Sequence, residues 1–205
     1  MDREHIRGIA QDVWSVEANS ISNLKNVIDF NALESVIEIL CECKQNKGRV
    51  VTVGVGTSGV AARKVAHTLS CIEIPSFFLS AADGVHGALG ALQKGDVVVA
   101  ISKGGGTEEI LKILPAVSTK GAKLIGVTEK DDSPLAKASD VTFKVTVERE
   151  PDPFNMLATA STMAVIAAFD AVAIALMQYT GYRKEQFAVI HPGGAVGERL
   201  IKGKK

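Results

Sequence analysis

The chain has 205 residues, of which 46% are hydrophobic and 22% are charged. This is enough apolar material for the core of one α/β domain. Lysine and arginine number 23, aspartate and glutamate also number 23, and only 5% of the residues are aromatic. A balanced charge without a long basic run argues against binding of nucleic acid.

The N-terminal quarter predicts two helices. Residues 2–28 form an amphipathic pattern, and a second helical pattern begins at Asn31, where Glu34 three residues later suggests a capping box and Gly48 an end. The charged N-terminus does not resemble a secretory signal. The odd set of three cysteines fits reduced thiols in a cytoplasmic protein, and no further soft ligands near them suggest a metal site.

Five short runs are rich in β-branched and apolar residues and predict buried strands. They cover residues 49–54, 75–80, 96–102, 123–128 and 141–147. Helical patterns follow the first and third runs, and a short one follows the fourth. This alternation predicts an α/β fold, with a parallel sheet covered by helices on both faces.

Residues 156–179 form an apolar run long enough to span a membrane. However, the run contains several hydroxyl side chains and Asp170 in its middle. We therefore interpret it as a core helix packed on the sheet, and expect no membrane association. Asp170 is expected to bond to a neighbouring helix or subunit.

Two turns after predicted strands are rich in glycine and hydroxyl residues. These are "GVGTSG" at 54–59 and "SKGGGT" at 102–107, and each leads into a predicted helix. Helix N-termini offer free N–H donors to an anion, and glycine lets a phosphate approach the backbone closely. The hydroxyls of Ser58, Ser102 and Thr107 add donors. The alternative is a pair of tight turns in which Thr107 is only an N-cap.

The first turn also matches the G-x-G-x-x-G pattern of dinucleotide-binding proteins. That pattern expects an acidic residue at the end of the next strand, and Asp83 lies beyond it. The second glycine-rich turn would have no role in such a site. A nicotinamide-dependent enzyme is therefore a weak alternative.

Three side chains are candidates for acid–base chemistry. His191 precedes a Pro-Gly-Gly turn, His86 lies in the glycine-flanked "DGVHGALG", and Glu150 follows the fifth predicted strand. Imidazole suits proton transfer near neutral pH, and a carboxylate can act as the base. Glu148 and Asp83 are weaker candidates, and the alternative for Glu150 is an exposed charge in a polar loop.

Three stretches resemble the sugar isomerase (SIS) domain, most closely its arabinose 5-phosphate isomerases. They are "GVGTSGVAARKVAHTLSCIEIPSFFLSAADGVHGALGAL", the "AIS" turn with its Gly and Thr, and "FAVIHPGGAVGERL". The resemblance covers about residues 5–202. It implies one flavodoxin-like three-layer αβα sandwich with a five-stranded parallel sheet, in which helices at about 1–47 precede a core at about 48–202.

The resemblance also implies a homo-oligomer, commonly a tetramer, that isomerises phosphosugars without a metal or organic cofactor. Its common members carry two CBS domains after the SIS domain, so a stand-alone version is expected here. His86 and His191 would face the sugar, from different subunits if the site is shared, with Glu150 as the base. The phosphate would be bound by Gly56, Thr57, Ser58, Ser102, Lys103, Gly104, Gly105, Gly106 and Thr107.

The chain departs from those relatives in both turns. They usually have lysine where this chain has Thr57, serine where it has Gly104, and glutamate where it has Gly106. Lys103 could restore a positive charge near the phosphate or simply be solvated. The expected function is aldose–ketose isomerisation through a cis-enediol, with D-arabinose 5-phosphate and D-ribulose 5-phosphate as the leading pair. The alternative is a non-catalytic sugar-phosphate sensor.

Overall fold

The sheet has the order β2-β1-β3-β4-β5, and every neighbouring pair is parallel. The computed structural model describes residues 2–193. The strands are β1 (Val50–Gly54), β2 (Ser76–Leu79), β3 (Val97–Ile101), β4 (Lys123–Thr128) and β5 (Val141–Lys144). This is the flavodoxin-like order, so the predicted fold class is confirmed. Only β5 differs clearly from its predicted range, since it ends three residues early.

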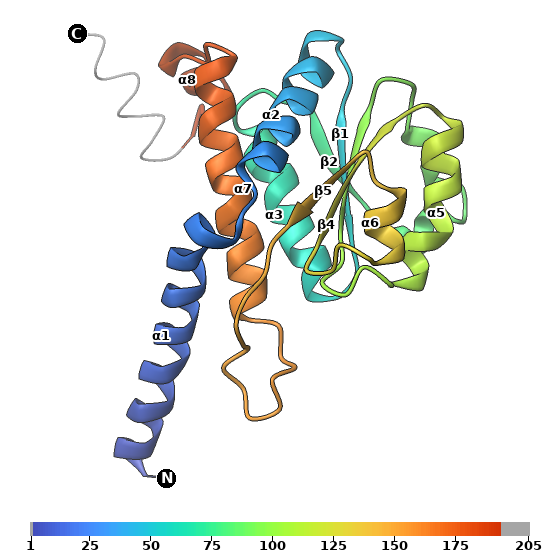
Figure 1. Ribbon diagram of the computed structural model, residues 1–205. Coiled ribbons are helices and arrows are strands. Elements are labelled where there is room, and N and C mark those ends of the chain that lie inside the picture. Colours follow the sequence, from blue (N-terminus) through green and yellow to red (C-terminus); the bar gives the residue numbers. More distant parts are fainter. Residues whose placement is uncertain (1, 194–205) are drawn as a thin grey trace, which may run out of the picture.

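Helices cover both faces of the sheet (Figure 1). One layer contains α2 (Phe30–Gln45), α3 (Thr57–Ser70) and α7 (Ala160–Tyr179), and the other contains α5 (Glu108–Thr119) and α6 (Pro134–Ala138). The long α1 (Arg3–Val27) packs along α7 and projects beyond the sheet. The remaining short helices are α4 (Ala81–Gly84), η1 (Ala88–Ala91) and α8 (Lys184–Ile190).

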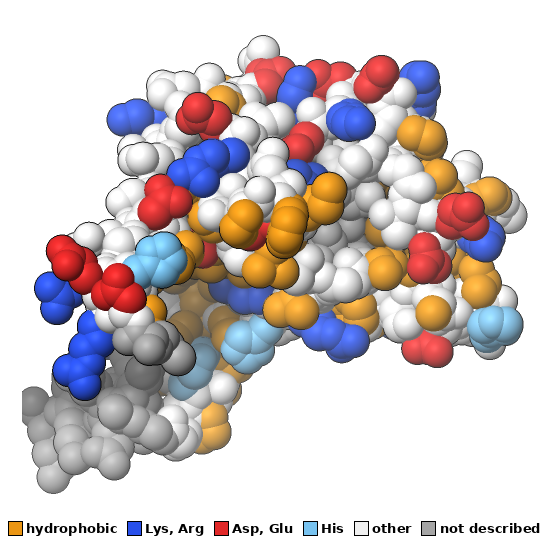
Figure 2. All heavy atoms as spheres, turned by 90° about the horizontal axis from the view of Figure 1, so that it is seen from below, with side chains coloured by type: hydrophobic (Ala, Val, Ile, Leu, Met, Phe, Trp, Pro, Cys, Tyr) orange, Lys and Arg blue, Asp and Glu red, His pale blue; other side chains and the backbone are white. Residues whose placement is uncertain are grey.

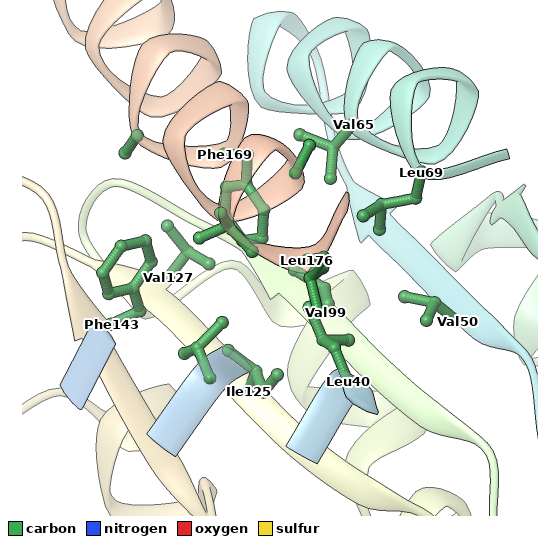
Figure 3. Close-up of a cluster of buried hydrophobic side chains, with 14 of the residues drawn as sticks. Leu40, Val50, Val65, Leu69, Val99, Ile125, Val127, Phe143, Phe169 and Leu176 are labelled. Carbon is green, nitrogen blue, oxygen red and sulfur yellow. The ribbon is translucent and has the colours of Figure 1, made fainter. Parts of the chain in front are cut away.

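The larger part of the core lies between the sheet and the layer of α2, α3 and α7 (Figure 3). Phe143 of β5 and Phe169 of α7 meet edge to face, with ring centroids 5.6 Å apart. A second cluster lies on the opposite face, where Val98 and Leu124 pack against Ile113 of α5. Apolar side chains on both faces of the central strands explain why those strands are almost continuously hydrophobic in sequence.

The predicted N-cap of α2 is wrong. Asp29, not Asn31, precedes the helix, and its carboxylate accepts the N–H of Asn31 at 2.9 Å. The helix ends at Gln45, and the chain turns at Lys47, which has a φ of 57°, one residue before the predicted stop at Gly48. Both Asp and Asn are good caps, so the sequence pattern alone did not distinguish between them.

The apolar run that ends at Tyr179 begins its helix at Ala160, and α7 is long and apolar enough to cross a membrane. Here it packs against α1, α2 and α3, and Asp170 forms an ion pair with Lys64 of α3. The predicted bond of Asp170 to a neighbouring helix is confirmed. The length and the apolar composition of α7 are therefore explained by its place in a helical layer that packs on the core.

All three cysteines are free thiols. Cys43 is buried in the larger core cluster. Burial, and to a lesser extent the nearby Asp96 carboxylate, raise its pKa to about 11. Cys43 is thus a neutral side chain of the core.

Candidate functional site

Both glycine-rich turns lie at the carboxyl ends of adjacent strands, β1 and β3. The strand order reverses direction between these two strands, and parallel α/β sheets bind ligands at that point. In Figure 1 this is the lower edge of the sheet, below which the loop from β5 to α7 also projects. The sequence turns and the topology therefore mark the same place.

The first turn opens α3 without any side-chain cap. Gly56 is the N-cap residue, with φ of 59° and ψ of −133°, and the helix begins at Thr57. Within the described residues, the N–H groups of Thr57 and Ser58 have no hydrogen-bond acceptor. They are the free donors that a helix N-terminus presents to an anion.

The second turn is held by hydroxyl contacts. Ser102 is buried at the end of β3, and its Oγ lies 2.8 Å from Oγ1 of Thr107 and accepts the N–H of Gly105 at 3.1 Å. Thr107 precedes α5 but makes no side-chain cap. Thr107 is thus the N-cap residue by position, as the alternative expected, although its hydroxyl contacts Ser102 instead of capping the helix. The N–H groups of Gly104, Gly106 and Thr107 have no acceptor in residues 2–193.

Gly105 has a specific structural role in this turn. Its φ is 65°, and a Cβ at this position would lie 2.1 Å from Oγ of Ser133. Its carbonyl oxygen accepts the N–H of Leu135 at 3.0 Å. By contrast, Gly104 and Gly106 have open space where a Cβ would be. Packing therefore requires glycine only at position 105. At Gly104 and Gly106 the absence of a side chain leaves the backbone of the turn accessible.

Glu150 is a buried carboxylate at the N-terminus of α7. Its exposed fraction is 1%, so it is not the exposed loop charge that the sequence allowed as an alternative. Oε2 accepts the N–H groups of Thr159 at 3.0 Å and Ser161 at 3.4 Å. Oε1 accepts the hydroxyl of Ser161 and the ammonium of Lys103, the latter at 2.7 Å.

These contacts determine how Glu150 titrates. Burial raises the pKa of its carboxyl, but hydrogen bonds from Lys103, Ser161 and Thr159 together lower the pKa by more. The net pKa is below its usual value, so Glu150 is ionised at neutral pH. The partial positive charge of the helix N-terminus favours the same form.

Lys103 connects Glu150 to a second carboxylate, Glu129, which follows β4. Lys103 Nζ is 3.8 Å from Oε1 of Glu129, and that oxygen is buried with no hydrogen-bond partner among the described residues. Burial raises the pKa of Glu129, the Lys103 ammonium lowers it by less, and its net pKa is above the usual value. Lys103 therefore faces two carboxylates.

A small cavity of about 30 Å³ lies beside this group, room for about one water molecule. Its polar wall consists of Ser58, Lys103, Thr128, Glu129, Ser161 and Thr162. Ser58 from the first turn and Lys103 from the second thus reach one space. A sugar phosphate is larger than this cavity, so it would lie in the open region of the turns and enter the cavity only if a lining side chain moves.

Neither histidine forms a hydrogen bond or ion pair with Glu150 within residues 2–193. His86 is exposed after α4, and its side chain makes no hydrogen bond within residues 2–193. His191 ends α8, where its ring stacks on Phe187 with centroids 3.9 Å apart. Because α7 has 20 residues, its far end lies about 30 Å from the end that holds Glu150.

Contacts of the segment after α7 confirm this separation. Tyr182 donates its hydroxyl to the carbonyl oxygen of Cys71, and Gln186 donates to the carboxylate of Glu73. Both acceptors lie in the turn before β2, at the amino edge of the sheet. The "HPGGAVGERL" motif can be followed only to Gly193, because residues 194–205 lie outside the described part of the chain.

The sequence analysis did not select Glu129, Thr159 or Ser161. Glu129 follows β4 directly, so the same rule that selected Glu150 after β5 would also have selected it. Ser161 lies in the small-residue start of α7, where nothing in the sequence signals a carboxylate contact. As for metals, residues 2–193 contain no group of three or more His, Cys, Asp or Glu that could hold an ion.

The chain was compared with known protein families and with individual proteins. The SIS domain model matches residues 44–175. The arabinose 5-phosphate isomerase KdsD of Pseudomonas aeruginosa is 45% identical over 155 residues, which are 76% of this chain and 48% of that protein. KdsD of Francisella tularensis is 36% identical over 192 residues, 94% of this chain and 58% of the relative. The chain thus spans about half the length of these curated relatives.

Solved structures give the same picture over whole chains. A candidate sugar-phosphate isomerase from Listeria monocytogenes is 55% identical, with a TM-score of 0.91, and covers 94% of this chain and 100% of its own. A protein of Escherichia coli CFT073, solved in complex with arabinose 5-phosphate, is 32% identical with a TM-score of 0.88. That match covers 94% of this chain and 100% of the other.

The turn at Gly105 can be tested by stability. Gly105→Ala is expected to lower the free energy of unfolding by about 2 kcal/mol, because alanine disfavours a positive φ and its Cβ would overlap Ser133. For a chain of this size that is a loss of roughly 4–8 °C in Tm. Gly104→Ala, in open space, is the matched control. Equal Tm values for the two variants would contradict the role of Gly105.

The raised pKa of Glu129 gives a pH-dependent prediction. The folded protein holds this proton more tightly than the unfolded chain, so the contribution of Glu129 to stability decreases as pH rises through its pKa. Glu129→Gln is therefore expected to raise Tm at pH 7, on the order of 2 °C. Near pH 3, where the carboxyl is protonated in both states, the gain should vanish. A destabilised variant at pH 7 would contradict this, and Glu38→Gln on the exposed face of α2 is the control.

Proposed function

This chain belongs to the SIS domain family, and we propose that it is a phosphosugar aldose–ketose isomerase. The observation that carries the proposal is an ionised, buried Glu150 on the same edge of the sheet as two turns with free N–H donors. Isomerisation of a sugar phosphate needs both features: a group that binds the phosphate, and a base near the sugar carbons.

The leading substrate pair is D-arabinose 5-phosphate and D-ribulose 5-phosphate. The KdsD relatives are named for the first sugar, and the Escherichia coli protein was solved with arabinose 5-phosphate bound. The 55% identity to the Listeria protein extends the sugar-phosphate assignment over nearly the whole chain. The differences at Thr57, Gly104 and Gly106 lie in the phosphate turns and bear on which sugar is preferred.

The phosphate is bound by backbone and hydroxyl donors. Gly56, Thr57 and Ser58 contribute from the first turn, and Ser102 to Thr107, with Lys103 alongside, from the second. The usual lysine and glutamate side chains are missing at Thr57 and Gly106, but within residues 2–193 the backbone N–H groups of Thr57, Gly104 and Gly106 have no acceptor. Helix N-termini attract phosphate without a charged side chain, so the loss of these groups does not abolish the anion site.

The chemistry is a proton transfer between neighbouring carbons. Glu150 takes the proton from C2 of the open-chain aldose, the electrons of the C2–H bond form the C1=C2 double bond, and the C1 carbonyl oxygen accepts a proton from a histidine. The resulting cis-enediol loses its O2 proton and receives the proton of Glu150 at C1, which yields the ketose. His86 and His191 open the ring and move protons at the oxygens, and no cofactor takes part.

The site is shared between subunits of a homo-oligomer in the cytoplasm, with a tetramer as the leading form. Within one chain, His191 follows the far end of α7, and that end lies about 30 Å from the end beside Glu150. The face in Figure 2 presents a group of apolar side chains, and the loop from β5 to α7 exposes Phe154, Met156 and Leu157. Such exposed groups mark interaction surfaces, so a second copy can bring its own His191 to the site.

The first prediction concerns turnover. Incubation with D-ribulose 5-phosphate should yield the aldose, and Glu150→Gln should lower kcat by about 10²–10⁴-fold because the base is lost. Glu38→Gln should match the unaltered protein. Aldose formation is followed by chromatography, and a Tm measurement checks that the variant is folded. Unchanged turnover in Glu150→Gln would refute Glu150 as the base. A thermal shift with sugar phosphates but no turnover on a panel of them would instead favour the sensor.

A second prediction concerns the shared site. Glu150→Gln and His191→Ala should each be inactive alone, but co-expressed chains should regain activity. In a two-fold assembly, about a quarter of the sites would combine an intact Glu150 with the partner's intact His191. A co-expressed pair of two differently tagged Glu150→Gln chains is the control. Mixed oligomers that stay inactive would show that each chain uses its own histidine.

A further inference from the structure

Lys103 lies between two carboxylates with very different surroundings. Its Nζ is 2.7 Å from Oε1 of Glu150 and 3.8 Å from Oε1 of Glu129. Glu150 also accepts a hydroxyl and two backbone N–H groups. The facing oxygen of Glu129 is buried and has no hydrogen-bond partner in the described structure. The ammonium therefore pairs with Glu150, which already accepts three other hydrogen bonds, and not with the facing oxygen of Glu129, which accepts none among the described residues.

Little movement is needed to exchange the partners of Lys103. Its side chain is 41% exposed and has four rotatable methylene bonds, so an ångström-scale shift brings Nζ within hydrogen-bond distance of Glu129. The backbone is fixed meanwhile. The carbonyl oxygen of Lys103 accepts both the hydroxyl of Thr128 and the N–H of Glu129, each at 3.0 Å. The side chain can thus move while the turn stays in place.

The resting position of Lys103 is unfavourable for a base. The ammonium and the Ser161 hydroxyl occupy Oε1 of Glu150, and the two N–H groups at the start of α7 occupy Oε2. A carboxylate stabilised in this way takes up a proton poorly. Departure of Lys103 removes the one charged donor that the described residues give Glu150 and leaves the other three contacts, which hold the carboxylate in position.

We propose that Lys103 is a counter-ion shared by Glu150 and Glu129, and that Glu129 is a positioning residue that draws the ammonium away from Glu150 when a sugar phosphate occupies the site. Oε1 of Glu150 is then free to take the substrate proton. The inference rests on the proposed function. The cavity supports it, because Lys103 and Glu129 line the same small space that a sugar would have to enlarge.

The pH dependence follows from the groups around Glu129. These are the Lys103 ammonium, the Glu150 carboxylate, the nearby Lys130 and the backbone N–H of Val147. Since burial dominates, the pKa of Glu129 is raised, whereas the pKa of Glu150 is lowered. As pH falls, Glu129 is protonated first and can no longer hold the ammonium, which stays on Glu150. The acidic limb of the rate profile of the native protein therefore reports Glu129.

The kinetic test is Glu129→Gln, with Glu38→Gln as the control. The amide cannot compete for Lys103, so kcat should fall on the order of tenfold, as for a weakened base. The acidic limb of kcat should also move to lower pH, because only Glu150 is left to set it. Glu129→Asp should recover part of the rate. A rate loss with an unmoved acidic limb would reduce Glu129 to a structural residue and overturn the proposal.

A second measurement needs no turnover. Side-chain carboxyl resonances of ¹³C-labelled glutamates are titrated in the full chain and assigned with Glu129→Gln and Glu150→Gln. In Lys103→Gln both carboxyls should titrate at higher pH than in the native protein, whereas Glu38→Gln should move neither. A shift of Glu150 alone would show that Lys103 is not shared. If no sugar phosphate is isomerised, the proposed function fails, while this titration still decides whether the counter-ion is shared.

Discussion

The buried carboxylate of Glu150 is the interaction on which this edge of the molecule depends. An ionised group with 1% exposure is tolerated only when it is paired and hydrogen-bonded, and here the donors come from two separate segments of the chain. The N–H groups belong to the start of α7, the ammonium belongs to the turn after β3, and Glu150 itself follows β5. One charge thus fixes the long helix, the loop before it and one of the two glycine-rich turns with respect to each other.

The parallel sheet explains why these parts meet. All five strands end at the same edge, and the reversal of strand order between β1 and β3 leaves room between the two turns. The glycines of the second turn serve two different purposes, close packing and access for a ligand. Gly105 fits against Ser133, whereas Gly104 and Gly106 cover nothing and leave their N–H groups free. Gly105 thus holds the turn in place, whereas Gly104 and Gly106 leave its backbone accessible.

The length of α7 has the opposite effect, because it separates groups that the proposed chemistry would combine. The helix begins at Ala160, beside the Glu150 carboxylate, and ends beside the amino edge of the sheet, where Tyr182 and Gln186 are held by contacts to Cys71 and Glu73. A chain built in this way has Glu150 at one end of α7 and His191 beyond the other. The exposed apolar groups of the loop before α7, and of α1 at Trp14, give a physical reason for association.

The sequence by itself determined the strands, the two turns, the family resemblance and the position of Glu150 at a strand end, because these follow from local pattern and from the rule that parallel strands end together. It did not decide how the side chains pair. Lys103 and Glu150 are 47 residues apart in the sequence, and the Thr107 hydroxyl contacts Ser102 instead of capping its own helix. Such pairs depend on which atoms tertiary packing brings within about 3 Å of each other. The contact of Glu129 with Lys103 and the separation of His191 from Glu150 likewise emerged only from the folded arrangement. Burial determines the surroundings of Glu129, and the length of α7 determines how far His191 lies from Glu150. Residue type alone determines neither.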